Sequence, residues 1–365
     1  MDRYLRGLLL LVLAGAIALP AGLIGAQTNA GQAQNPPQKK GAEQKQAEQT
    51  DQDYTEEEYN AMEAVRNEQD PAKKAALVMA FLEKYPKSTL KVYVINAYET
   101  MLFELSKAGD HQKLMQFSEQ WLKLNPNDVK CQAYIFDAAV ALGQHQKTVD
   151  FGEKVFAVQP SAKLALPIYQ AYEKLGNKVK REEWALKLLQ FPEYANDIQL
   201  RMQLVFDYAE KDLAKSAMYA EQALKALPNA QKPAEMQDGE WAKALTSVKK
   251  TCYDIVGKNF FTQNKFSEAI QTLAKANQVV GKNIVAEKYD EGFYYIGMSQ
   301  WKQGNVEDAW LSLETAAQIK GKLETKAHKY AIDLYKSQRN DTEVGFDKVV
   351  KKALAILDAM IKGTA

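Results

Sequence analysis

The stretch that decides the fold is KTCYDIVGKNFFTQNKFSEAIQTLAKANQVVG, residues 250–281, read beside DEGFYYIGMSQWKQGNVEDAWLSLETAAQIKG, residues 290–321. The two stretches align without a gap, and equivalent residues are 40 positions apart. Large and small residues match at seven positions: Tyr253, Val256, Gly257, Phe260, Ala269, Leu273 and Ala276 against Phe293, Ile296, Gly297, Gln300, Ala309, Leu313 and Ala316. A fixed spacing of this kind indicates a repeat array, which favours an interaction surface over a catalytic pocket.

Turn residues recur upstream at about the length of one helix pair. Gly109, Gly143 and Gly176 are separated by 34 and 33 residues, and Pro126 and Pro160 by 34. A glycine can supply the left-handed turn that ends one helix, and a proline ends the next helix. We therefore expect amphipathic helices over 110–125 and 144–159. No run of alternating β-branched residues after residue 54 predicts a strand.

The pattern resembles that of the tetratricopeptide repeat family, and in particular its exported bacterial members. The resemblance covers roughly residues 55–321 and is most specific in the two quoted stretches, where Asn264 and Gly304 occupy the turn between helices. It implies an all-α fold, a right-handed α-solenoid of antiparallel helix pairs. About seven pairs and a terminal helical cap would fit this length of chain.

The resemblance and the composition together predict six segments. These are a signal peptide at 1–26, a disordered Gln-rich tether at 27–53, degenerate repeats at 54–228, a loop at 229–239, two well-matched repeats at 240–321 and capping helices at 322–365. The loop and a second insertion after Gly281 leave two arrangements open: two sub-arrays, or loops that bulge from one continuous superhelix.

The N-terminus predicts export. Arg3 and Arg6 precede an apolar run over residues 7–24, which is typical of a secretory signal. The alternative is an uncleaved N-terminal membrane anchor, although Pro20 and several glycines interrupt the run. No cysteine follows the run, so the anchoring residue of a lipoprotein is absent. We expect a periplasmic or secreted protein.

Charge and cysteine content exclude several classes. The chain has a formal net charge of +1, with both signs interspersed, which argues against nucleic acid as a partner. Cys131 and Cys252 are the only cysteines. Because a disulfide requires Cα atoms less than about 7 Å apart and these residues belong to distant repeats, we expect two unpaired and mostly buried thiols.

Catalytic and cofactor motifs are missing from the sequence. There is no Gly-rich phosphate loop, no His-Glu-x-x-His and no nucleophile elbow. His111 and His145 recur at equivalent turns without a nearby ligand set, so no metal, catalytic residue or cofactor is predicted. The sequence therefore favours a non-catalytic scaffold.

The resemblance also implies where a partner would bind. In that family the first helix of each pair lines a concave groove, which here would expose Asp254, Lys258, Phe261, Glu291, Tyr294, Met298, Trp301 and Lys302. Rigid aromatic residues edged by charges are typical of a peptide-binding hot spot. The alternative for the aromatic residues is packing against neighbouring first helices or the C-terminal pair. The family's Lys and Asn clamp for a terminal carboxylate is absent.

We therefore predict an extracytoplasmic scaffold that binds a protein or peptide segment in its groove, with a role in envelope assembly suggested by analogy alone. The competing hypothesis is a small-ligand or catalytic protein that uses a pocket inside the superhelix. Convergence of Asp254, Lys258 and Glu291 in such a pocket would favour it.

Overall fold

A computed structural model describes residues 53–364 of the chain. The predicted signal peptide and nearly all of the predicted tether lie outside these residues. Between residues 53 and 364 the chain forms sixteen α-helices and two short 3-10 helices, and no strand occurs there. The all-α class is therefore confirmed. The chain divides between Leu188 and Leu189 into two compact units, called here the N-terminal unit and the C-terminal unit.

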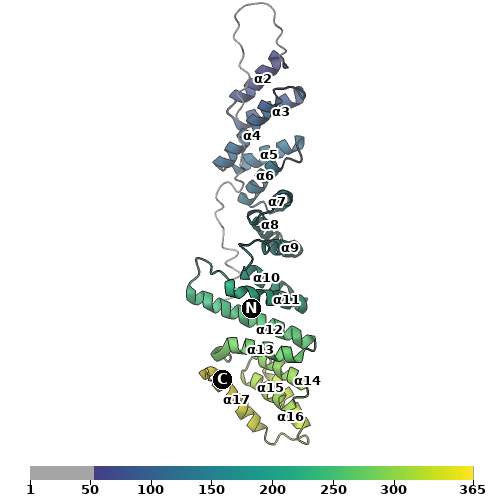
Figure 1. Ribbon diagram of the computed structural model, residues 1–365, viewed down its shortest axis with the longest axis vertical. Helices are drawn as coiled ribbons and strands as arrows, with labels where there is room; N and C mark the ends of the chain where they lie inside the picture. Colours follow the sequence, from purple (N-terminus) through teal and green to yellow (C-terminus); the bar gives the residue numbers. More distant parts are fainter. Residues whose placement is uncertain (1–52, 365) are drawn as a thin grey trace, which may run out of the picture. The chain divides into compact units, whose positions relative to one another are not determined.

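The N-terminal unit consists of consecutive helix pairs (Figure 1). Each helix packs against the next one in the chain, and short turns make the partners antiparallel. The helices are α2 (Glu56–Asn67), α3 (Pro71–Lys84), α4 (Lys91–Ala108), α5 (His111–Leu124), α6 (Val129–Ala141), α7 (His145–Val158), α8 (Ala162–Lys174) and α9 (Lys178–Leu188). The two helices predicted over 110–125 and 144–159 are α5 and α7.

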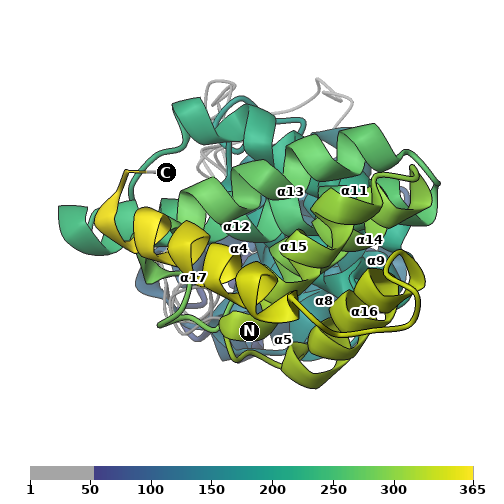
Figure 2. The same ribbon diagram turned by 90° about the horizontal axis from the view of Figure 1, so that it is seen from below.

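The C-terminal unit continues the same arrangement with longer connections. Its helices are α10 (Ile198–Tyr208), α11 (Leu213–Ala226), α12 (Asp238–Thr262), α13 (Phe266–Val280), α14 (Glu291–Lys302), α15 (Val306–Gln318), α16 (Glu324–Ser337) and α17 (Phe346–Lys362). The 3-10 helix Leu227–Asn229 ends where the predicted loop 229–239 begins, and the 3-10 helix Gly281–Asn283 begins the second predicted insertion. Helices α16 and α17 both pack against α15, and Figure 2 shows them nearest the viewer. Both helices lie in the stretch 322–365, where capping helices were expected.

Local sequence sets where the helices begin and end. Asp110 and Asp128 each cap a helix by accepting a hydrogen bond from the backbone N–H three residues on. Gly109, Gly143 and Gly176 have φ angles of 70°, 65° and 69°, so the predicted left-handed turns are confirmed. Asn264 adopts the same conformation at φ 60°, which asparagine tolerates better than most residues.

Small residues at fixed repeat positions allow the paired helices to approach closely. A Cβ atom on Gly257 would lie 2.5 Å from Leu273 Cγ on the partner helix. On Gly297 it would lie 2.7 Å from Leu313 Cγ and 3.0 Å from the Ala309 carbonyl oxygen. These distances are too short for carbon, so the matched glycines of the two quoted stretches are required by packing.

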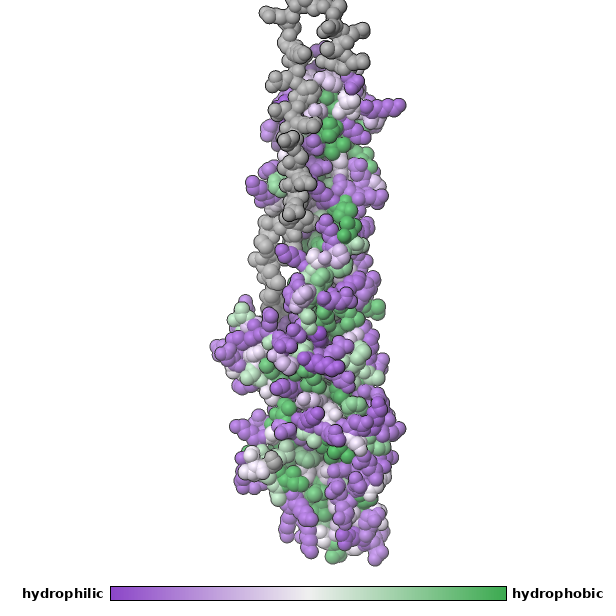
Figure 3. Space-filling view, viewed as in Figure 1, coloured by the Kyte–Doolittle hydropathy of each residue, from purple (hydrophilic) through white to green (hydrophobic). Residues whose placement is uncertain are grey.

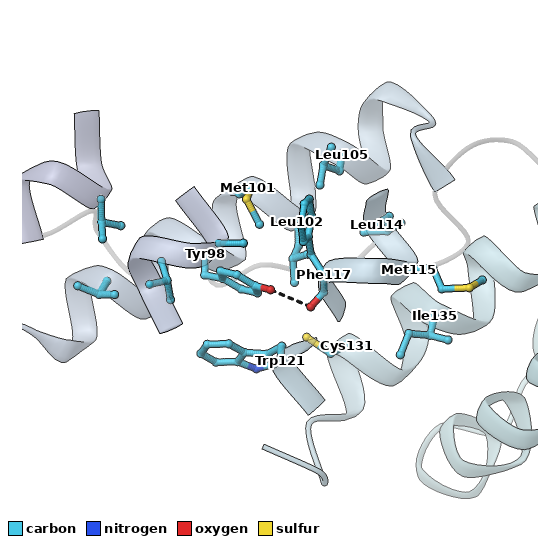
Figure 4. Packing of buried hydrophobic residues seen from close by; sticks show 14 of the residues in the cluster. Tyr98, Met101, Leu102, Leu105, Leu114, Met115, Phe117, Trp121, Cys131 and Ile135 are labelled. Carbon is cyan, nitrogen blue, oxygen red and sulfur yellow. Dashed lines mark hydrogen bonds between the residues drawn. The ribbon is translucent and has the colours of Figure 1, made fainter. Parts of the chain in front are cut away.

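The core of the N-terminal unit is aromatic and aliphatic (Figure 4). Tyr98 stacks on Trp121 with ring centroids 5.0 Å apart, and its hydroxyl donates a hydrogen bond of 2.8 Å to the Phe117 carbonyl oxygen. Trp121 Nε1 donates a hydrogen bond to Asp128 Oδ2 at 2.8 Å. Asp128, which caps α6, therefore also provides the acceptor for the buried indole N–H. Cys131 lies in this core and Cys252 is buried in the C-terminal unit, both as free thiols, which confirms that prediction.

Hydrophilic side chains cover most of the face shown in Figure 3, and hydrophobic residues there form small separate areas. The last helix, α17, has a polar outer face, because Lys348, Lys351, Lys352 and Asp358 are exposed on it. Among the helices described between residues 53 and 364, none combines the length and apolar character needed to span a membrane.

Candidate functional site

All eight predicted groove residues lie on α12 and α14, the first helices of two consecutive pairs. These helices contact each other, and α16 continues the row because Tyr330 on α16 stacks on Tyr294 of α14. On α14, residues 294, 298 and 301 share one side because they are four and three positions apart. Helices α12, α14 and α16 therefore present adjacent sides to one surface.

Four aromatic rings cross this row of helices in sequence, and we call them the aromatic ladder: Phe261, Tyr295, Tyr294 and Tyr330. The centroids of successive rings are 5.3, 5.2 and 6.4 Å apart. Aromatic pairs in edge-on or offset geometry stabilise a protein by about 0.5–1.5 kcal/mol beyond their burial. The ladder is therefore a rigid support that links three first helices.

The predicted aromatic residues differ in exposure, and the expectation that Tyr294 is exposed is wrong. Trp301 is 40% exposed, and the Lys302 ammonium lies 4.8 Å from the centroid of its ring. Tyr294 is only 4% exposed, because Tyr295, Tyr330 and Met298 surround it in a hydrophobic cluster. Tyr294 thus belongs to the core, whereas Phe261 and Met298 are partly buried and form the edge of the surface.

The predicted charged residues form a chain of ion pairs beside the ladder. Lys258 Nζ lies 2.6 Å from Asp254 Oδ2 and 3.0 Å from Glu291 Oε2. Lys322, from the connection before α16, reaches Glu291 Oε1 at 2.5 Å. The Tyr289 hydroxyl donates to Asp254 Oδ1 at 2.8 Å. We call Asp254, Lys258, Glu291 and Lys322 the ionic chain.

Burial and pairing shift the pKa values within the ionic chain in different directions. Burial raises the pKa of Asp254 above its usual value, although Lys258 opposes the shift. Burial also acts to raise the pKa of Glu291, but Lys258 and Lys322 outweigh it, so the pKa of Glu291 lies below its usual value. The pKa of Lys258 is raised: its two carboxylate neighbours outweigh the opposing effect of burial.

The prediction that Asp254, Lys258 and Glu291 present free polar groups to a groove is wrong, because these residues form ion pairs within the ionic chain. Their side chains are only 13%, 19% and 20% exposed and are bound to one another. The residues do converge, as the small-ligand hypothesis requires, but their charges are neutralised by partners within the chain. Their geometry is that of a structural network that ties α12 to α14 and to the start of α16.

Three residues of this surface were not predicted: Tyr295, Tyr330 and Lys326. The Lys326 ammonium lies 5.3 Å from the Tyr294 ring centroid and 5.9 Å from that of Tyr330. The prediction missed Tyr330 and Lys326 because it treated the C-terminal helices only as a cap. Continuing the repeat count into α16 would have placed both residues beside α14. We call the surface formed by Phe261, Tyr295, Met298, Trp301, Lys302, Lys326 and Tyr330 the first-helix face.

Histidine and acidic residues do not assemble a metal site in residues 53–364, where no group of three or more potential ligands lies close enough to hold an ion. His328 instead contacts Glu314, a fully buried carboxylate, with Nδ1 2.7 Å from Oε2. The Gln318 amide donates to the other oxygen of Glu314 at 2.6 Å. The His328 contact joins α16 to α15, and the Gln318 contact lies within α15. Both contacts stabilise the packing of these helices.

Surface hollows occur away from the first-helix face. The largest of three, with a volume of about 560 Å³, lies between α15 and α16 and is lined by Gln318, Lys320, His328 and Ile332 among others. One at Trp241 has about 220 Å³, and one between α3 and α5 has about 360 Å³. These three hollows do not include any residue of the ionic chain.

Comparison with known proteins gives matches only among solved structures. No family model and no curated protein matches the chain. The TPR domain of P58(IPK) is similar with 10% identity over 77% of this chain and 79% of that chain, at a TM-score of 0.29. A tetratricopeptide repeat protein from Parabacteroides merdae gives 14% identity, 76% and 98% coverage, and a TM-score of 0.27.

A third similar structure is YrrB, described as a TPR protein with an unusual peptide-binding site, with 13% identity, 70% and 98% coverage and a TM-score of 0.25. TM-scores this low establish neither a common superhelical geometry nor a common function. The class of the protein follows from its own architecture. Each of its two units is an array of consecutive antiparallel helix pairs, as in an α-solenoid.

Proposed function

We propose that the protein is a non-catalytic scaffold that binds a protein or peptide segment on the first-helix face. One observation carries the proposal: Trp301 is 40% exposed on α14, the helix that also carries Tyr294 and Tyr295 of the aromatic ladder. Tryptophan is among the residue types most enriched where binding energy concentrates in an interface. A rigid support keeps the entropy lost on binding small.

The ionic chain supports binding over chemistry at this place. A general acid, base or nucleophile must be free to contact a substrate. Asp254, Lys258 and Glu291 are engaged with each other, with Tyr289 and with Lys322. The small-ligand or catalytic alternative would need these contacts to open.

The test is peptide selection on the full chain followed by affinity measurement. Peptides selected from a random display library would be titrated against the wild type, Trp301→Ala and Leu354→Ala. Leu354 is a matched control because it is 48% exposed on α17, outside the first-helix face. We expect Trp301→Ala to weaken binding about tenfold or more and Leu354→Ala to leave it unchanged. Equal binding by a folded Trp301→Ala variant would refute the proposal.

We further propose that the chain acts outside the cytoplasm, as a scaffold in envelope assembly. The support is the sequence of residues 1–26, with Arg3 and Arg6 before an apolar run. Mass spectrometry of the N-terminus of protein made in a bacterial host tests this. A mature chain that begins near residue 27 in the periplasmic fraction is expected. Retention of Met1 in the membrane fraction would support an anchor instead, and Met1 in the cytosol would contradict export.

A further inference from the structure

We infer that the segment bound on the first-helix face is acidic and carries aromatic or aliphatic side chains. We also infer that its binding does not require a free C-terminal carboxylate. This inference rests on the proposed function and adds the chemistry of the partner. It follows from the balance of free and neutralised charges around the aromatic ladder.

The carboxylates beside the ladder are already neutralised. Asp254 is bound by Lys258 and Tyr289, and Glu291 by Lys258 and Lys322. Low exposure shields both carboxylates from a partner, whereas Lys322 remains 69% exposed. A basic segment would therefore find no free acidic group in the ionic chain.

Two cations on the same face have no such neutralisation. The Lys302 ammonium lies over the ring of Trp301, and the Lys326 ammonium over the rings of Tyr294 and Tyr330. Within residues 53–364 neither forms an ion pair, and both side chains are exposed. A cation–π contact is worth only about 0.5–1 kcal/mol at an exposed site. Because this contact is weak, each ammonium group remains available to bind a carboxylate of a partner.

The first-helix face thus combines apolar contact area with an excess of positive charge. Lys302 on α14 and Lys326 on α16 are exposed, and the same face carries the exposed Trp301 and the partly buried Met298, Phe261 and Tyr295. Aromatic or aliphatic side chains of a partner would pack on these apolar side chains, while its carboxylates would bind the ammonium groups of Lys302 and Lys326. Complementary charge of this kind selects the partner and speeds association more than it adds affinity.

A terminal carboxylate is not needed for this recognition. Lys302 and Lys326 come from different helices and point to rings, and they do not form the Lys and Asn clamp whose absence is noted above. The two cations belong to α14 and α16. Such a spread suits several acidic side chains along one segment better than a single chain end.

The experiment compares three fluorescein-labelled, N-acetylated and C-amidated peptides by anisotropy against the full chain. One contains Asp, Glu, Phe and Leu; the second has Asn and Gln in place of the acids; the third has Lys in their place. We expect the acidic peptide to bind most tightly, with an affinity that falls as NaCl is raised. Lys302→Gln with Lys326→Gln should weaken it about fivefold or more. Lys320→Gln with Lys329→Gln should not, because it removes two exposed cations elsewhere, one in the connection after α15 and one on α16.

The outcomes separate the inference from the proposed function. If neutral and acidic peptides bind equally and both depend on Trp301, the face binds peptides but the inferred chemistry is wrong. Preference for the basic peptide also overturns the inference. If no peptide depends on Trp301, the proposed function itself fails. A version of the acidic peptide with a free C-terminus that binds far more tightly than the amide would show recognition of a chain end and contradict the inference.

Discussion

The rings of Tyr294 on α14 and Tyr330 on α16 stack with their centroids 6.4 Å apart. Through this contact the C-terminal helices extend the row of first helices and do more than close the end of the array. The first-helix face therefore spans three helices. Lys326, which lies over both rings, belongs to the same surface.

Gly297→Ala should destabilise the C-terminal unit, although alanine is a better helix former than glycine. The added Cβ would meet Leu313 Cγ and the Ala309 carbonyl oxygen, and backbone cannot move aside cheaply. We expect a loss of about 1–3 kcal/mol in the free energy of unfolding, measured by urea denaturation. Gly239→Ala in the first turn of α12 is the control, because nothing lies within 4 Å of its new Cβ. A stabilised Gly297→Ala variant would contradict the packing described for α14 and α15.

Asp137→Asn should change how stability depends on pH. Burial raises the pKa of Asp137 on α6 to about 7, and its Oδ1 has no hydrogen-bond partner. In the folded chain the ionised form is disfavoured, so this residue's contribution to stability is present below its unfolded pKa of about 4 and is lost as pH rises to about 7.

The asparagine variant has no carboxyl group to ionise at this position, so its stability does not fall for this reason as pH rises. We expect it to match the wild type near pH 4 and to exceed it by roughly 2–4 kcal/mol near pH 8, an upper range for a group of this burial. Urea denaturation of both proteins at the two pH values measures the difference. A gap that does not grow with pH would show that Asp137 is ionised without penalty in the folded chain.

Lys258→Met should destabilise the C-terminal unit because it leaves Asp254 without its cation and Glu291 with only Lys322. Removing one partner of a buried ion pair costs about 3 kcal/mol or more. Lys265→Met is the matched control, since this exposed lysine makes only a cation–π contact with Phe260 at 5.9 Å. Thermal unfolding followed by circular dichroism would measure both. Equal losses in the two variants would mean that the ionic chain does not tie α12 to α14.

Tyr98→Phe should weaken the N-terminal unit while it preserves the stack on Trp121. The variant removes the 2.8 Å hydrogen bond to the Phe117 carbonyl oxygen in a buried site. The expected loss is about 1–2 kcal/mol by urea denaturation. Tyr93→Phe, a partly buried tyrosine on the same helix, is the control and should change stability little. If Tyr98→Phe is also neutral, the hydroxyl makes no net contribution to the core.

Helix spacing was predictable because packing and turn chemistry act within one helix pair. The 34-residue interval between Gly109 and Gly143 comes from two helices and two turns, and the structure shows both glycines in the left-handed conformation. The match of Gly257 to Gly297 likewise reflects close approach within each pair. These constraints can be read from one stretch of chain.

The binding surface was harder to predict because it depends on contacts between pairs. Repeat position alone could not show that Tyr294 would be covered by Tyr330, which is 36 residues further along the chain. Nor could it show that Lys322 would reach Glu291 from the connection before α16. Residues at nominally exposed positions become buried wherever neighbouring first helices carry large side chains.

Site-specific cross-linking can show directly whether a partner binds on the first-helix face. A benzophenone amino acid would be placed at Lys302, at Tyr295 or, as a control on α17, at Leu354, and irradiated with a peptide selected on the wild type. We predict cross-links from positions 302 and 295 and none from position 354. Cross-linking from position 354 with none from 302 or 295 would contradict binding on the first-helix face.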